Sequence, residues 1–274
     1  MCPRRRNSGV GLSVKLGVHE TAEKSTIEVT GFTKGIITDD QRAQFGIENA
    51  ELKEMVNKYH GGSVNDVFTS DPTPWNNLYK TYKWEEVYVL LTAVDAEVIE
   101  LTSNPVILGA KTLTNHSNVD AEFTTSISES VTESFSSTWN SSLASTLGQE
   151  VSYGVEGIAG GKTSFSFTTE FGESETTSHQ ATVGASSGVP VVLRPKQSVI
   201  AKLSASRGTL KARVTYEARL GGLVACNYNP THKGHHFWAL GIQNVMTTPS
   251  VKMITQDIDV GYYSTGNVTL ESLE

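Results

Sequence analysis

Three histidines lie close together in the chain and are the first candidates for chemistry. His232, His235 and His236 fall within the segment 231–238, and imidazole both ligates metals and titrates near neutral pH. The segment supplies no cysteine or carboxylate at a usual ligand spacing. A metal site, a pH-sensitive patch and a structural turn are the alternatives. The turn is favoured, and no metal is expected.

A glycine-rich segment, residues 157–163 (GIAGGKT), resembles a phosphate-binding loop but lacks its first glycine, because Glu156 stands at that position. The residues after Thr163 alternate as in a strand, whereas a phosphate loop must open a helix. No nucleophile elbow, HExxH motif, paired-carboxylate signature or dinucleotide fingerprint occurs in the sequence. We therefore expect a protein that is not an enzyme and has no cofactor.

The strongest pattern is a long alternation of apolar and polar side chains. Period two places the two sets on opposite faces of a strand. Twelve of the nineteen residues from 124 to 142 are Ser or Thr, and residues 136–149 contain no ionisable side chain. The sequence therefore predicts an amphipathic hairpin over about residues 135–171. Its apolar face consists of the odd-numbered residues Phe135, Trp139, Leu143, Leu147, Val151, Tyr153, Val155, Phe165, Phe167 and Phe171.

The parity of the two arms predicts how they pair. If the chain turns around Ile158, odd positions face odd positions, with Val151 opposite Phe165 and Leu147 opposite Thr169. A register slip of one residue would destroy this match. The expected hairpin tip consists of Gly157, Ile158, Gly160 and Gly161.

Two interpretations of the alternation compete. Ordinary antiparallel sheets alternate because one face packs on a core. Transmembrane barrel strands carry the same pattern, and about 9–11 residues cross the hydrocarbon. The uncharged, hydroxyl-rich composition favours a hairpin that crosses lipid, with its even positions lining water.

The length, composition and net charge of the chain exclude several classes of protein. The chain has 274 residues and a net charge of −7, which argues against nucleic-acid binding and against charge-driven binding to anionic lipid. Frequent Ser, Thr, Val and Gly with little helical periodicity predict a mostly-β fold. Neither a transmembrane helix nor a signal peptide is recognisable. Cys2 and Cys226 leave one disulfide possible.

One helix and an aromatic cluster are expected in the first hundred residues. Caps at residues 38–40, apolar residues at helical spacing from Leu52 to Tyr59, and Gly61 predict a helix with a packing role. The aromatic residues that follow form either a receptor or carbohydrate platform or the cover of a core. They are Trp75, Tyr79, Tyr82 and Trp84.

Four stretches together resemble the aerolysin-like β-pore-forming proteins, in the epsilon-toxin/mosquitocidal-toxin branch. Residues 104–118, followed by residues 123–130, look like the strand that enters the pore module, and residues 136–171 look like the insertion hairpin. Residues 171–178 are similar to the segment that closes this hairpin. The segments 188–196 and 212–217 are similar to the return strands. The resemblance covers about residues 100–220.

The resemblance implies an elongated body of long, twisted antiparallel strands with a smaller N-terminal α+β lobe. Residues 1–100 would form the receptor-binding lobe and residues 101–274 the pore-forming module. It implies a secreted protein that binds an unknown receptor or glycan, assembles into a homo-oligomeric ring such as a heptamer, and inserts one hairpin per subunit into the target-cell membrane. The alternative is a non-lytic lectin-like, storage or yolk protein that retains the fold.

Overall fold

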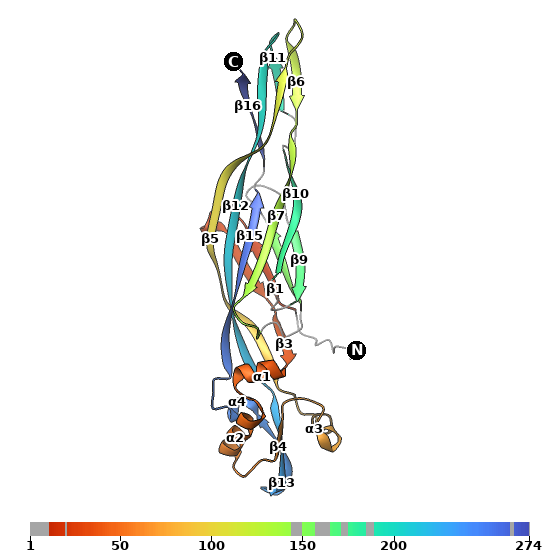
Figure 1. Ribbon diagram of the computed structural model, residues 1–274, viewed down its shortest axis with the longest axis vertical. Helices are drawn as coiled ribbons and strands as arrows, with labels where there is room; N and C mark the ends of the chain where they lie inside the picture. The colour runs from red at the N-terminus through yellow and green to blue at the C-terminus, as the bar shows by residue number, and fades with distance from the viewer. Residues whose placement is uncertain are drawn as a thin grey trace.

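The computed structural model describes residues 11–19, 21–143, 150–156, 165–170, 175–184, 189–263 and 266–273, with residues 150–156 and 165–170 described by their backbone. The molecule is long and narrow (Figure 1). Its helices gather at one end with β4 (Asp66–Phe68) and β13 (Leu223–His232). The opposite end carries β6 (Ala121–Thr125) and β11 (Val189–Leu193), which pair with each other. The mostly-β, elongated fold class is confirmed.

The body is built on two very long strands. β5 (Tyr88–Thr114) has 27 residues and β12 (Ser198–Gly221) has 24, against about 3–10 for ordinary strands. They pair antiparallel along the whole of β12. Three register shifts interrupt this ladder, and such bulges bend a strand and increase its twist. The curved body seen in Figure 1 follows from this pairing.

The described part of the body sheet runs in the order β10 (Glu175–Gly184), β7 (Ser128–Trp139), β15 (Val251–Tyr263), β12, β5 and β3 (Phe32–Ile36), with β16 (Asn267–Leu273) beside the far end of β12. From the sequence, the segments 86–94, 97–101 and 110–114 are expected to be three short strands separated by turns. In the structure, residues 88–114 are one continuous strand. Pro105 does not end it, because Pro105 is exposed and, among the described residues, the edge of β5 away from β12 is paired only at residues 88–92, with β3. Sheet edges tolerate proline.

The helical lobe begins with two helices where one was expected. α1 (Asp39–Phe45) starts with a capping box between Thr38 and Gln41 and ends at Gly46, whose φ is +66°. That left-handed conformation suits glycine and stops a helix. α2 (Asn49–His60) then buries Leu52, Met55 and Val56 on one face, while Tyr59 is exposed.

The lobe also takes elements from the second half of the chain. β4 and β14 (His235–Gly241) flank β13 in a three-stranded sheet. α3 (Pro74–Tyr82) and α4 (Ile242–Val245) complete the lobe. The boundary expected at residue 100 falls inside β5, so lobe and body share a continuous strand.

A second sheet joins the N-terminal strands to the predicted hairpin. Its order is β2 (Thr26–Thr30), β1 (Ser13–Gly17), β8 (Glu150–Glu156) and β9 (Phe165–Glu170). A short 3-10 turn, Ala22–Lys24, links β1 to β2. β1 and β8 run parallel, whereas the other pairs in this sheet are antiparallel.

A buried hydrogen-bond chain fixes β7 against the body. The Tyr216 hydroxyl on β12 donates to Gln256 Oε1 on β15 at 2.8 Å, and Gln256 Nε2 donates to Ser137 Oγ on β7 at 2.7 Å. All three side chains are at most 1% exposed. Buried polar groups are costly without partners, so the chain specifies one register for β7.

We expect Gln256→Ala to destabilise the protein by about 2–5 kcal/mol, because it removes a buried hydrogen bond from each of two hydroxyls and opens a cavity. Urea denaturation measures the loss, with Met253→Ala as control, because Met253 is exposed on the same strand. A Gln256→Ala loss no larger than that of Met253→Ala would show that the hydrogen-bond chain does not hold β7.

Candidate functional site

The strand that leads into the predicted hairpin shows the expected alternation. On β7 the odd positions from Val131 to Ser137 are buried, whereas the even positions are exposed or half-buried. Phe135 is 1% exposed and lies in the main core. The Trp139 ring is half-buried, with its centroid 5.2 Å from that of Tyr216. The apolar face of this arm therefore packs on the body.

Beyond β7 the chain is attached to α1. Leu143 is fully buried in the main core. Its carbonyl accepts a hydrogen bond from Gln41 Nε2 at 3.1 Å, and Ser142 Oγ accepts one from Gln44 Nε2 at 3.2 Å. Both glutamines belong to the helix whose capping box fixes its start. The helical lobe thus holds the chain at residues 142 and 143, just beyond β7.

β8 and β9 form the expected antiparallel hairpin, with a different register. Val151 lies opposite Thr169 and Val155 opposite Phe165. The pairing of Val151 with Phe165, expected from a turn at Ile158, is wrong, because the ladder is centred two residues further along. Odd positions still face odd positions, since a two-residue displacement of the centre preserves parity.

Some predicted site residues lie outside the described residues. They are Leu147 and Phe171 of the apolar face and Gly157, Ile158, Gly160 and Gly161 of the tip. Val151, Tyr153, Val155, Phe165 and Phe167 are placed by their backbone, in the ladder of β8 and β9.

β1 occupies the other edge of β8. The parallel register pairs Val14 with Tyr153 and Leu16 with Val155. Val14 and Leu16 are fully buried in the main core. Partners directly across a ladder share a face of the sheet, so the odd positions of β8 are in register with the buried face of β1.

A buried carboxyl on β7 was missed from the sequence. Glu133 is 1% exposed. Its Oε1 accepts the backbone N–H of Tyr263 at 3.5 Å, and its Oε2 has no hydrogen-bond partner in the described part of the chain. Burial raises the pKa of Glu133, against the lowering effects of the Tyr263 hydrogen bond and of His179. The sequence did contain a sign of this burial, because Glu133 is a charged residue at an odd position, where the alternation otherwise places the apolar face.

Five rings form an aromatic shelf on the lobe, made of Phe68, Trp75, Tyr82, Trp84 and Phe237. Ring centroids of Trp75 and Phe237 are 5.3 Å apart, and Tyr82 stacks on Trp84 at 4.7 Å. Trp75 is 44% and Tyr82 49% exposed, and Trp84 is half-buried. Aromatic pairs at such distances stabilise each other, so the shelf is an ordered surface.

Tyr79, expected with the other aromatics, lies in the core and not on the shelf surface. It is 4% exposed. Its hydroxyl oxygen lies 2.7 Å from the carbonyl oxygen of Phe68 and 2.9 Å from that of Leu223. Burial raises the pKa of this hydroxyl. Tyr79 therefore joins α3 to β4 and β13 and is not accessible to a partner.

The shelf begins in a strained turn. Trp75, Asn76 and Asn77 have φ values of 59°, 62° and 55°, a region that bulky residues rarely adopt. The turn is held because the Leu78 N–H donates to Thr73 Oγ1 at 2.7 Å and Thr81 Oγ1 donates to the Asn76 carbonyl at 2.8 Å. A shallow hollow lined by Asn76, Asn77, Lys80 and Thr81 adjoins it. Strain of this kind often accompanies binding surfaces.

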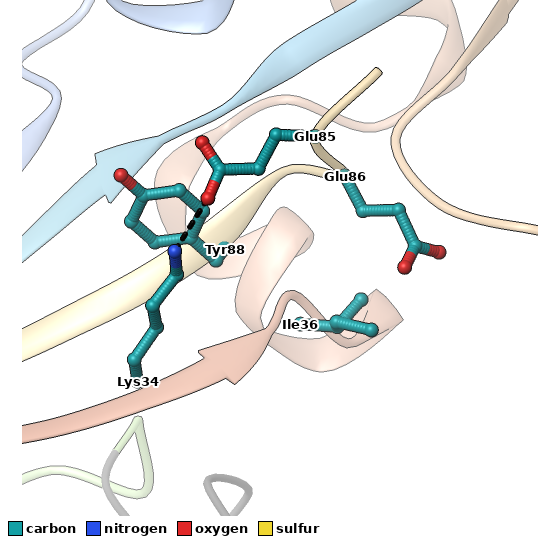
Figure 2. A pocket seen from close by; sticks show the side chains of 5 residues that line it. All are labelled: Lys34, Ile36, Glu85, Glu86 and Tyr88. Atoms are coloured by element: carbon teal, nitrogen blue, oxygen red, sulfur yellow. Dashed lines mark hydrogen bonds and ion pairs between the residues drawn. The ribbon is translucent and has the colours of Figure 1, made fainter. Parts of the chain in front are cut away.

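A second hollow lies where the lobe meets the body (Figure 2). Lys34 Nζ lies 2.5 Å from Glu85 Oε1 and 3.6 Å from the centre of the Tyr88 ring. Glu86 points away from this pair in Figure 2, and its Oε1 accepts the Asp71 N–H at 2.6 Å. Lys34, Glu85 and Glu86 already have partners within the fold. We therefore interpret the hollow as a structural junction between β3 and β5.

The histidines lie at the tip of the lobe. His232 packs with His60 of α2 at a centroid distance of 5.2 Å, and His60 packs on Trp238 at 4.6 Å. Burial lowers the pKa of His60, with Lys233 and His232 adding to the effect. In the described ranges, no group of three or more His, Cys, Asp or Glu is placed to hold a metal ion. Lys233 and Gly234 form a turn between β13 and β14, as the favoured interpretation expected. The pH-sensitive patch stays an alternative.

Among the described residues, no helix is both long and apolar enough to cross a membrane. Cys226 is a free, buried thiol on β13, and burial raises its pKa to about 12. Cys2 lies outside the described residues.

Comparison with solved structures defines the class of protein. Parasporin-2, a Bacillus thuringiensis toxin that recognizes cancer cells, matches with a TM-score of 0.65 and 19% identity, covering 88% of this chain and 100% of that one. A non-toxic crystal protein from Bacillus thuringiensis matches with a TM-score of 0.53 and 12% identity, covering 81% and 94%. The fold is aerolysin-like.

Sequence comparison then gives the family. U-megalopygitoxin(8)-Mo12 of Megalopyge opercularis is 31% identical over 252 residues, which cover 91% of this chain and 88% of the relative. U-megalopygitoxin(8)-Mc8 of Megalopyge crispata has the same identity and coverage. No family model matches the sequence. The chain belongs to the family of the U-megalopygitoxin(8) proteins.

The raised pKa of Glu133 predicts a pH-dependent stability. The folded protein holds the Glu133 proton to a higher pH than the unfolded chain, whose carboxyl titrates near 4.5. The stabilisation from this proton is present below that pH and is lost as pH rises through the folded pKa. We expect Glu133→Gln to be about 1–3 kcal/mol more stable than the unmutated protein at pH 8, because it removes a poorly satisfied buried charge, with the difference shrinking toward pH 4.

Urea denaturation across pH 4–8 measures this difference. Glu129→Gln is the control, because Glu129 is exposed on the same strand. A pH-independent effect of Glu133→Gln would contradict a raised Glu133 pKa.

Proposed function

We propose that this protein is a secreted pore former that oligomerises on a target membrane and inserts one amphipathic β-hairpin per subunit into a closed barrel. The observation that carries this proposal is the pairing of β8 with β9, in which odd positions lie opposite odd positions. With the sequence alternation, this register gives one hairpin an apolar and a hydroxyl-rich face. The toxin names of its relatives support the same activity.

The soluble structure supplies the cover that such a hairpin needs. Phe135 and Leu143 are buried against the body and lobe, and β8 is paired with β1. In lipid, a strand must satisfy every backbone group internally, which a closed barrel does. The odd residues from Phe135 to Phe171 would then face hydrocarbon, and the even Ser, Thr and Asn residues would line water.

Insertion requires the hairpin to lengthen. The β8–β9 ladder joins residues 150–155 to residues 165–170, fewer pairs than the about 9–11 residues per strand that cross a bilayer. Extension has to recruit the segments between β7 and β8 and between β9 and β10. The first of these is tethered to α1 through Leu143, so α1 must release it.

The receptor contact is proposed for the aromatic shelf. Trp75 and Tyr82 expose aromatic faces beside the polar hollow of Asn76 and Lys80, and Trp84 supports Tyr82 by stacking. Exposed aromatics are frequent binding hot spots. Because the net charge of −7 disfavours anionic lipid, a receptor or glycan would concentrate the protein on its target. We assign the chain to the epsilon-toxin/mosquitocidal-toxin branch on the sequence stretches alone.

A non-lytic binding protein is the second candidate, and the protein is non-enzymatic in both. The exposed shelf favours it, as does the non-toxic protein that shares the fold. Electron microscopy on receptor-bearing membranes separates the two functions. Rings accompanied by calcein release support the pore former. Membrane or glycan binding without rings on any target, including after proteolysis or at low pH, would establish the second function.

Neighbouring positions of β8 test the lipid face. Tyr153→Arg should abolish calcein release while leaving binding and ring assembly intact, because arginine facing lipid costs about 2–4 kcal/mol per strand at the bilayer midplane. The ring multiplies that cost by its subunit number. Ser152→Arg should still insert, and planar-bilayer conductance should shift toward anions.

Ser152→Arg is the matched control, since it places the same charge one residue away. Equal loss of conductance in the two variants would show that the odd and even faces are wrongly assigned.

The shelf is tested by Trp75→Ala and Tyr82→Ala. Each should weaken cell binding tenfold or more, as expected for hot-spot aromatics, in flow cytometry with labelled protein. Tyr59→Ala is the control, because Tyr59 is 52% exposed on α2 and outside the shelf. If the shelf variants bind cells normally but melt earlier than Tyr59→Ala, the aromatics only cover the core.

A further inference from the structure

The two edges of the hairpin differ. β8 is paired on both sides, with β9 on one edge and β1 on the other. In the described part of the chain, β9 is paired on one side alone, because it ends its sheet. An unpaired strand edge is a template for pairing with another chain, so the hairpin has one open edge and one edge that β1 covers.

β1 is fixed to the body and cannot leave with the hairpin. Leu12, Val14, Leu16 and Val18 are at most 1% exposed and belong to the main core. On its other side β1 pairs with β2 over residues 26–30. If β8 enters a membrane, the β1–β8 ladder is therefore the place where the sheet opens.

Resting on the pore function proposed above, we propose that the β8 edge covered by β1 is the surface that binds a second copy of this chain. In a barrel made of hairpins, the outer edge of each β8 needs an antiparallel neighbour. The open outer edge of β9 from the next copy supplies it. Two different edges that pair head to tail form a heterologous interface, and such an interface forms a ring when the rotation between copies closes.

The energetics favour exchange over simple release. Pulling β8 from β1 into an unpaired state would strip the backbone bonds of residues 152–156, and unpaired backbone groups are costly away from water. Replacement by a second copy's β9 restores those bonds. It also exchanges a parallel pair for an antiparallel pair, which is slightly more stable per residue.

β1 thereby has two effects in the soluble protein. It covers an edge that would otherwise pair with other copies before a membrane is reached. Because β1 offers parallel pairing over five residue pairs, it is a replaceable partner. Assembly and insertion are coupled, since the edge is exchanged only where a second hairpin is available.

Cysteine staples test the exchange at a single β1 position. Lys15→Cys with Gly154→Cys joins β1 to β8, and Lys15→Cys with Glu28→Cys joins β1 to β2. Both are register partners, and paired strands fall within the Cα separation that a disulfide spans. Ser13→Cys with Ser152→Cys is a second β1–β8 staple. All carry Cys2→Ser, and circular dichroism confirms that each is folded.

Each protein is oxidised with copper phenanthroline and applied to cells that the unmutated protein permeabilises. We expect both β1–β8 staples to bind cells but to release less than a tenth of the calcein. Reduction with dithiothreitol should restore release. The β1–β2 staple should release dye when oxidised as well as when reduced.

Undiminished release by the oxidised β1–β8 staples would overturn the edge exchange and leave the pore function standing. Loss of release in all oxidised staples would also overturn it, because immobilising β1 itself would be the cause. If neither the unmutated nor the reduced proteins released dye from any target, the pore function would fail, and the exchange with it.

Discussion

The pairing of β12 along both of its edges is the interaction on which the rest of the structure depends. β12 meets β5 over its full length, and on the other edge it meets β16 and then β15. Tyr216 of this strand reaches β7 through Gln256. The same strand enters the lobe, where Leu220 bonds to the chain before β15. Lobe, body and hairpin arm are therefore aligned on one strand, so the release of the hairpin in the proposed mechanism would leave the body intact.

The apolar face of the hairpin imposes a second constraint, because it has to be covered in water. Two elements cover this face, the body under Phe135 and α1 beside Leu143, while β1 pairs with the edge of β8. Each is a short contact of modest size, whereas the β12 ladder is long. We therefore expect the hairpin contacts to open at a lower free energy than the β12 ladder, since regions with few buried contacts open at lower free energy than the main core.

Much of this arrangement follows from local sequence rules. The alternation at Phe135 and the helix ending at Gly61 were predictable because period and capping are local properties. The continuity of β5 through Pro105 was missed, since it depends on neighbours distant in sequence. The break at Gly46 was also missed, although a glycine at a helix end is a local signal. The β1–β8 pairing was also unpredictable, because parallel pairing leaves no local turn signal. Burial of Tyr79 and Glu133 depends on which face of the fold each one occupies.

The positions of charged residues limit the length of the segment that can cross lipid in the proposed pore. At odd positions, no charged residue occurs between Glu133 and Glu173. A carboxylate facing hydrocarbon is unfavourable, so these residues mark the limits of the span. Each arm between them exceeds the about 9–11 residues that a barrel strand needs, which leaves Glu133 room to stay outside. Because edge exchange conserves the backbone hydrogen bonds of β8, transfer of the uncharged odd face from the body to lipid has to drive insertion.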